Sequence, residues 1–221
     1  MDFDWEQPRD QQEYIGYMTL IVETWAAFQQ SPLQLIVTVA LHPNQYLPSA
    51  VYPYIDRVHV MAYDMITPSA HGGGYLHHAR FDKAKEVIAS FVERGCPRSK
   101  LVLGMPAYGR HAHDPGRVAT YSEAVSELDH VNELQDLHTR NEFHGYLFDS
   151  PADVRSKVKW AAGANLAGVF FWEAGQDKIF EASTGAMGLL QSAADEASQL
   201  LSNLAGFEVE SAEYPKSRAE L

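Results

Sequence analysis

Short apolar runs alternate with helical stretches along the chain, and this alternation restricts the fold more than any other feature. Residues 34–41 and 101–105 are almost continuously apolar, which is typical of parallel strands that are covered on both faces. Residues 2–6, 57–64 and 167–172 complete a set of five predicted strands. Because helical stretches separate these strands, the sequence predicts a parallel α/β sheet.

Apolar residues at three- and four-residue steps indicate the helices. Helices are predicted over residues 10–30, 81–94 and 187–203, with a shorter one near 122–128 and another from Ser150 to Gly163. The β/α units fit the second half of an eight-stranded barrel, so residues 1–204 are predicted to form one incomplete (β/α)8 TIM-barrel domain. Residues 205–221 are expected to be a polar C-terminal tail without regular structure.

The charge balance narrows the range of partners. Lys and Arg number 17 against 29 Asp and Glu, and the net charge of −12 argues against nucleic acid or an anionic membrane as partner. No apolar run approaches the roughly 20 residues that a membrane span needs. No basic segment followed by an apolar one opens the chain, so no signal peptide is visible. Cys96 is the only cysteine, which excludes an intrachain disulfide, and it is expected in a helix-to-strand turn.

Asp2, Asp4 and Glu6 recur at two-residue spacing in the first predicted strand. Their side chains are expected on one face, about 7 Å from one to the next, with Phe3 and Trp5 on the other face. Like charges stacked in this way repel one another, so chains that tolerate them usually use them for acid and base chemistry. The alternative is a solvated edge strand. Polar residues also follow the other predicted strands, and ligands bind at this carboxyl edge of parallel sheets.

Four blocks of the sequence resemble, in order, motifs of the chitinase-like family 18 glycoside hydrolases. Asp2-x-Asp4-x-Glu6 resembles the end of the family's D-x-x-D-x-D-x-E signature, on its fourth strand. Met61-x-Tyr63-Asp64 is similar to the M-x-Y-D block, and Gly104-x-Pro106-x-Tyr108-Gly109-Arg110 is similar to the G-x-P-x-Y-G-R block. Residues 168–177, which include Trp172, resemble the ending of the eighth strand. The resemblance covers roughly residues 1–190 and implies a (β/α)8 barrel.

The resemblance also implies a reaction, the hydrolysis of β-1,4 links next to N-acetylglucosamine with retention, in which the substrate's own acetamido group is the nucleophile. Glu6 is implied as the general acid, Asp4 as the stabiliser of the cationic intermediate, and Asp2 as the holder of a proton beside them. The implied position of Tyr63 is at the acetamide oxygen. Substrate contacts are implied for Asp64, Met61, Tyr108, Arg110 and Trp172, the last as an apolar floor. The implied partner is an N-acetylglucosamine oligosaccharide or chitin, with no cofactor and no metal.

The chain departs from the family pattern in its extent. The first aspartate of the signature and the first three strands would precede Met1, and five strands cannot close a barrel. Either the chain is a fragment or a truncated gene model, or something else completes the barrel. The segment between Arg110 and Ser150 is predicted to be too short for the α+β insertion domain that deepens the cleft in some members. Members are often secreted, and the compartment of this chain stays open.

Alternatives stay open for the function and for two groups of side chains. A catalytically silent carbohydrate-binding protein on the same barrel is the rival class, and an inactive fragment is the third. The presence of Glu6 favours the enzyme. Arg110 either contacts sugar or braces its loop by pairing with an acid. His71, His77 and His78 lack a matching Cys or acid cluster, so a loop lining the sugar cleft is favoured over a metal site.

Overall fold

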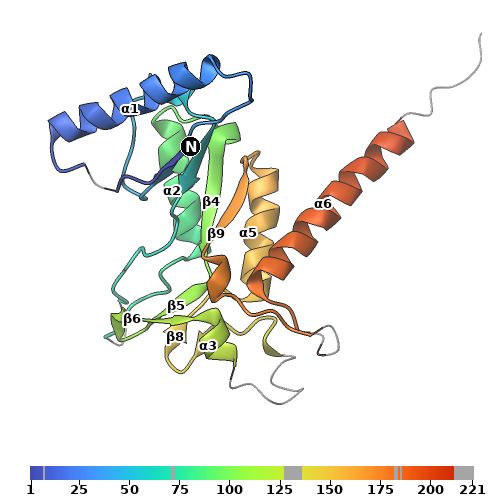
Figure 1. Cartoon of the computed structure of the whole chain (residues 1–221). Helices are drawn as coiled ribbons and strands as arrows, with labels where there is room; N and C mark the ends of the chain where they lie inside the picture. The colour runs from blue at the N-terminus through green and yellow to red at the C-terminus, as the bar shows by residue number, and fades with distance from the viewer. Residues whose placement is uncertain (7, 71–72, 127–135, 182–183, 185, 212–221) are drawn as a thin grey trace, which may run out of the picture.

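Five parallel strands form the main sheet of the computed structural model, in the order β1-β2-β3-β4-β9 (Figure 1). They span Asp2–Phe3 (β1), Thr38–Leu41 (β2), Arg57–Val60 (β3), Leu101–Pro106 (β4) and Gly168–Trp172 (β9). The structure describes residues 1–6, 8–70, 73–126, 136–181, 184 and 186–211, with side chains described to residue 203. All five predicted strands are present, although β1, β2 and β3 are shorter than predicted. Each pairs in parallel with the next, and β1 and β9 are the edge strands of the described sheet.

Helices follow the strands of the main sheet. They span Gln11–Gln29 (α1), Phe81–Glu93 (α2), Pro151–Gly163 (α5) and Leu189–Ser211 (α6), with short 3₁₀ helices at Tyr52–Tyr54, Arg98–Lys100 and Ala174–Gln176. The last of them, α6, packs mainly against α5. The predicted start of α5 is confirmed by a reciprocal cap. The Ser150 hydroxyl accepts from the backbone N–H of Asp153, and the Asp153 carboxylate accepts from the backbone N–H of Ser150.

Helix α6 extends further than the sequence predicts. It continues to Ser211, past the domain boundary expected at residue 204, and its C-terminal half points away from the sheet in Figure 1. No proline interrupts residues 189–211, so backbone hydrogen bonds can continue where the apolar pattern ends. The expected tail is therefore helical in its first part, and residues 212–221 lie outside the described residues. No described helix is both long enough and apolar enough to cross a membrane.

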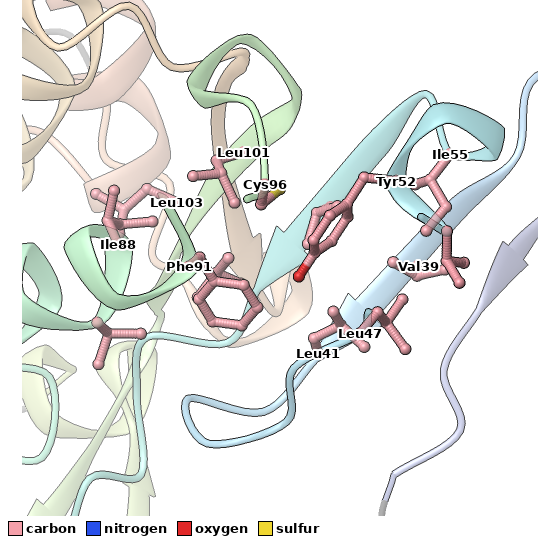
Figure 2. Close-up of a cluster of buried hydrophobic side chains, with 14 of the residues drawn as sticks. Val39, Leu41, Leu47, Tyr52, Ile55, Ile88, Phe91, Cys96, Leu101 and Leu103 are labelled. Atoms are coloured by element: carbon pink, nitrogen blue, oxygen red, sulfur yellow. The ribbon is translucent and has the colours of Figure 1, made fainter. Parts of the chain in front are cut away.

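The main core lies between the sheet and helices α1 and α2. Figure 2 shows apolar side chains of β2, α2 and β4 packed in one cluster that includes Phe91. Cys96 belongs to this cluster and is 2% exposed in the connection between α2 and β4, as predicted. Burial raises the pKa of its thiol to about 12, so Cys96 acts as a small apolar residue. Because alternate residues of each strand enter this core, the residues between them face the other side of the sheet.

A second, antiparallel sheet lies between β4 and α5 in the sequence, at the lower end of the molecule in Figure 1. Its order is β6-β5-β8-β7, and it comprises Tyr108–His111 (β5), Asp114–Thr120 (β6), Glu142–Phe143 (β7), Tyr146–Leu147 (β8) and, after β6, the short helix Tyr121–Val125 (α3). In this segment the sequence pattern indicates only a short strand at residues 145–148, which corresponds to β8, and the short helix. The expectation that this segment is too short for an inserted subdomain needs correction. Four short strands suffice because Tyr121, Phe143 and Phe148 pack edge to face as a small core.

Candidate active site

A cavity of about 370 Å³ opens at the carboxyl ends of the main-sheet strands. Its lining residues are Asp2, Asp4, Glu6, Ala40, His42, His59, Met61, Tyr63, Asp64, Tyr108, Phe170 and Trp172. Every predicted site residue lines this cavity except Arg110. Because parallel strands end at one edge of their sheet, residues far apart in the sequence meet there. The structure thus brings the predicted residues together, while their roles stay predictions.

The three acids line the cavity although strand β1 ends at Phe3. The predicted alternation persists beyond the strand, because Phe3 packs against the main core and the Trp5 ring lies 5.6 Å from the ring of Tyr17. With both aromatic side chains held on that side, the acidic side chains face the cavity. Asp4 and Glu6 make no hydrogen bond to another described residue, so their carboxylates are open to a ligand.

Asp2 is held by two residues that sequence reasoning missed. The Thr38 hydroxyl on β2 donates to Oδ1 of Asp2, and Nδ1 of His59 on β3 lies 3.3 Å from the same oxygen. A signal for His59 was present in the sequence, because it stands between Val58 and Val60. These two valines enter the core, so the residue between them has to face the cavity.

Phe170 also lines the cavity, although the sequence did not predict it there. The position of its ring depends on Gly104. A Cβ at Gly104 would lie 2.8 Å from Cζ of Phe170 and 2.6 Å from the carbonyl oxygen of Val60. Both distances are shorter than real Cβ contacts, so a side chain at this position would displace the Phe170 ring or the neighbouring strand. The glycine of the third sequence block therefore has a packing role in shaping the cavity.

Two tyrosines and one tryptophan join Phe170 in the aromatic part of the lining. The rings of Tyr63 and Tyr108 are 6.3 Å apart and meet edge to face. Burial raises the pKa of Tyr63, and the charges of Asp64, Asp4 and Glu6 raise it further, so the phenol keeps its proton and can donate a hydrogen bond. Trp172 is 50% exposed at the end of β9, and the peptide bond that follows it is cis.

Asp64 is the most firmly held acid of the cavity. The Arg110 Nε donates to Oδ1 of Asp64 at 2.6 Å, and the backbone N–H of Asp64 donates to Nδ1 of His78 at 3.1 Å. Burial raises the pKa of Asp64, but the adjacent His78 ring and hydrogen bonds from Arg110 and Tyr108 outweigh this effect and hold the pKa below its usual range. Arg110 also donates to the Pro115 carbonyl at 2.7 Å. Arg110 therefore braces Asp64 and the start of strand β6, and it does not line the cavity.

The expectation that His77 and His78 line the sugar cleft is wrong. His78 is 1% exposed and lies behind Asp64, with its Nε2 3.3 Å from the carbonyl oxygen of Tyr108. The His77 ring stacks on the His78 ring at 5.2 Å. His71 lies outside the described residues, among which no group of three or more His, Cys, Asp or Glu is arranged to hold a metal ion.

A buried ion pair lies beneath the two histidines. The Lys157 ammonium on α5 donates to both carboxylate oxygens of Asp149, at 2.7 and 2.5 Å, and to the carbonyl oxygen of Ala79, at 2.7 Å. Lys157 and Asp149 are 1% and 4% exposed. The pair thus ties α5 to the loop that carries His77 and His78, and through His78 it supports the position of Asp64.

The buried state of His77 predicts a pH-dependent stability. Burial lowers the pKa of His77 to about 4, so between about pH 6.5 and pH 4 the unfolded chain binds more protons than the folded chain. The free energy of unfolding is therefore expected to fall with pH in this window, and to be about 2 kcal/mol smaller at pH 5 than at pH 7. Urea unfolding at the two pH values measures this difference. The window lies above the range in which the Asp64 carboxyl takes up a proton.

His77→Asn is the matched control for this prediction. The side-chain oxygen of asparagine can accept the backbone N–H of Ala79, which now donates to Nδ1 of His77 at 3.0 Å, and it does not titrate. The variant should lose most of the difference between pH 5 and pH 7. An unchanged difference would assign the pH dependence to another group.

The comparisons with known proteins all lead to the same family. The family model of the glycosyl hydrolases family 18 matches residues 1–177. Class V chitinase CHIT5 of Lotus japonicus is 25% identical over 224 residues, which cover 80% of this chain and 56% of that protein. The GH18 chitinase ChiB from the chitin utilization locus of Flavobacterium johnsoniae has a TM-score of 0.70 at 24% identity, covering 89% of this chain and 60% of that chain. The GH18 chitinase of Cycas revoluta in complex with (GlcNAc)3 has a TM-score of 0.66 at 24% identity, covering 88% and 67%.

Parallel β/α units with a polar cavity at the carboxyl edge of their sheet are the arrangement of (β/α)8 barrels and of open α/β sheets. The likeness to the two solved chitinases confirms the predicted incomplete barrel. The chain belongs to the glycosyl hydrolases family 18, whose model matches most of its length, so the resemblance found in the sequence is confirmed. It spans 56% of the length of the Lotus relative and 60% of the Flavobacterium chain.

Proposed function

We propose that this chain carries the catalytic face of a chitinase-type glycosidase, which hydrolyses β-1,4 links next to N-acetylglucosamine with retention of configuration. The observation that carries the proposal is the convergence of Asp2, Asp4 and Glu6 with Tyr63 and Trp172 in one cavity. Membership of the glycosyl hydrolases family 18 supports the reaction class. The (GlcNAc)3 in the complex of the Cycas chitinase supports this class of ligand.

The proposed reaction begins with proton transfer from Glu6. The Glu6 carboxyl protonates the glycosidic oxygen, and the C1–O bond breaks while the acetamido carbonyl oxygen of the same sugar bonds to C1. This closes a cationic oxazolinium ring, whose N–H donates to the Asp4 carboxylate. Water then attacks C1, the Glu6 carboxylate takes up the proton of that water, and the ring reopens to the acetamide. Two inversions at C1 retain its configuration.

Tyr63 and Asp64 position the sugar in this proposal. The Tyr63 phenol donates to the acetamido carbonyl oxygen and holds it below C1. The raised pKa of the phenol keeps the proton available for that hydrogen bond. Asp64 stays ionised, because its pKa is held below the usual range, and it accepts from a sugar hydroxyl. Arg110 keeps the carboxylate of Asp64 in place for this contact, and His78 holds the backbone of Asp64.

Turnover of chromogenic chitobiose and chitotriose substrates tests the proposal on the chain as it is. We expect release of the chromophore, with the β-anomer as the first sugar product in a proton NMR spectrum of the reaction. Calorimetric titration with (GlcNAc)3 measures binding separately. Binding without turnover would replace the enzyme by a carbohydrate-binding protein, and an α-anomer would overturn the retaining mechanism. The absence of both binding and turnover would identify the chain as an inactive fragment.

Trp172→Ala is expected to weaken substrate binding more than it slows the chemical step. A pyranose face stacked on the half-exposed indole removes roughly 50 Å² of apolar surface from water, which at about 25 cal/mol per Å² is roughly 1.3 kcal/mol, or about tenfold in binding. Steady-state kinetics should therefore show a KM about tenfold higher. Trp172→Phe keeps an aromatic face and should recover part of the loss. An unchanged KM in Trp172→Ala would remove Trp172 from the substrate site.

A further inference from the structure

His59 lies in the cavity wall and has no role in the proposed reaction. It stands on β3 between Val58 and Val60, both fully buried in the main core, so its imidazole points to the opposite side of the sheet. There the side chain is 25% exposed and lines the cavity. An imidazole in a cavity lined by four carboxylates can donate a hydrogen bond to one of them.

The carboxylate that His59 reaches is Asp2, across the intervening strand β2. Nδ1 of His59 lies 3.3 Å from Oδ1 of Asp2. The contact is possible because the residue beside His59 on β2 is Ala40, whose methyl group leaves the space above the sheet open. Thr38, two residues before Ala40, donates its hydroxyl to the same carboxylate oxygen. Oδ2 of Asp2 makes no hydrogen bond to a described residue, so it stays available to the neighbouring acid Asp4.

The imidazole is itself held in place by packing. The Phe170 ring lies 5.2 Å from the His59 ring at 56°. Phe170 is on β9 and reaches His59 over β4, where Gly104 has no side chain to block it. Ala40 and Gly104 are therefore the two small residues, one on each side of β3, that allow β1, β3 and β9 to meet through their side chains.

We propose that His59 is a positioning residue that acts through Asp2. Its Nδ1–H donates to Oδ1 and, together with the Thr38 hydroxyl, fixes the carboxylate so that Oδ2 faces the Asp4 side. The significance for catalysis rests on the proposed function and on the role that the family resemblance implies for Asp2, which is to hold a proton beside Asp4 and Glu6. Other titratable groups that face the same space are His42 after β2, Tyr63 and Asp64 after β3, and Tyr108 after β4.

Steady-state kinetics of His59→Leu and His59→Asn test the proposal. Leucine fills a similar volume but cannot donate, so kcat should fall about tenfold while KM stays within about twofold. The Nδ2 of asparagine lies close to the place of Nδ1 and can donate to Asp2, so kcat should recover to within about threefold of the wild-type value. Equal losses in both variants, or an effect on KM alone, would overturn the role of the Nδ1 donor.

A second measurement does not depend on turnover. Nitrogen-15 NMR of the histidine rings at neutral pH reports which ring nitrogen carries the proton, and the signal missing in His59→Asn belongs to His59. We expect a proton on Nδ1, and a shifted resonance in Asp2→Asn. A His59 ring with a bare Nδ1, or with no response to Asp2→Asn, would overturn the proposal. If Nδ1 carries the proton but the wild-type chain has no activity, the proposed function fails while the positioning of Asp2 by His59 stands.

Discussion

Glu6→Gln is expected to lower kcat for an N-acetylglucosamine oligomer by roughly 10²- to 10⁴-fold, which is the usual contribution of a general acid. The amide has the shape of the carboxyl group but no proton that it can transfer to the glycosidic oxygen. The Glu6 side chain makes no hydrogen bond to another described residue, so the change leaves the fold intact. Binding of (GlcNAc)3, measured by calorimetry, should stay within about threefold of the wild-type value.

Glu23→Gln is the matched control for this result. Glu23 is an exposed acid on α1, outside the cavity, and the same chemical change there should leave kcat unaltered. Thermal unfolding of both variants checks that the fold is preserved. Full activity of Glu6→Gln would remove Glu6 from the reaction and would favour a different acid of the cavity or a contaminating enzyme as the source of turnover.

Lys157→Met is expected to lower the free energy of unfolding by about 3–5 kcal/mol. Lys157 and Asp149 are both buried, and the substitution leaves the Asp149 carboxylate without its partner in an environment of low dielectric constant. The Ala79 carbonyl loses a donor at the same time. Urea unfolding followed by circular dichroism measures the change. The pair also supports the loop that carries His77 and His78. The substitution should therefore leave Asp64 less firmly held in the cavity.

Two further variants make this prediction decisive. The double variant Lys157→Met with Asp149→Leu removes both charges and should recover a large part of the loss, since a buried pair can often be replaced by apolar residues. Lys83→Met breaks an exposed pair with Glu86 and should cost well under 1 kcal/mol. A similar small loss in Lys157→Met, or no recovery in the double variant, would contradict the importance of the buried pair.

The parallel sheet could be predicted because its signals are local. A continuous apolar run such as 101–105, the capping residues Ser150 and Asp153, and the apolar steps of α2 each depend on neighbours within about one helical turn or one strand. Most of the second sheet lacked such signals. Strand β6 is mostly exposed and contains Pro115 and Gly116, and β7 and β8 have two residues each, so their pairing is decided by contacts with one another and not by pattern.

The candidate site likewise has one part that the sequence predicted and another that only the structure shows. The spacing of Asp2, Asp4 and Glu6 placed them on one face, and the structure keeps that arrangement even though the strand ends at Phe3. Arg110 shows the limit of this reasoning. From the sequence, its side chain could either contact the sugar or brace its loop by pairing with an acid. Only the folded chain brings its guanidinium to Asp64, 46 residues away in the sequence.

The sequence by itself determined which five segments contain the strands of the main sheet, which edge of that sheet carries the polar residues, and to which family the chain belongs. The tertiary structure decided how those residues are held. It brought the His59 imidazole to the Asp2 carboxylate across β2. It also brought the Lys157 ammonium to the carbonyl oxygen of Ala79, 78 residues away. The physical reason is that periodicity records which side of an element is buried, whereas a hydrogen bond or ion pair between distant elements depends on the packing of the strands and helices between them.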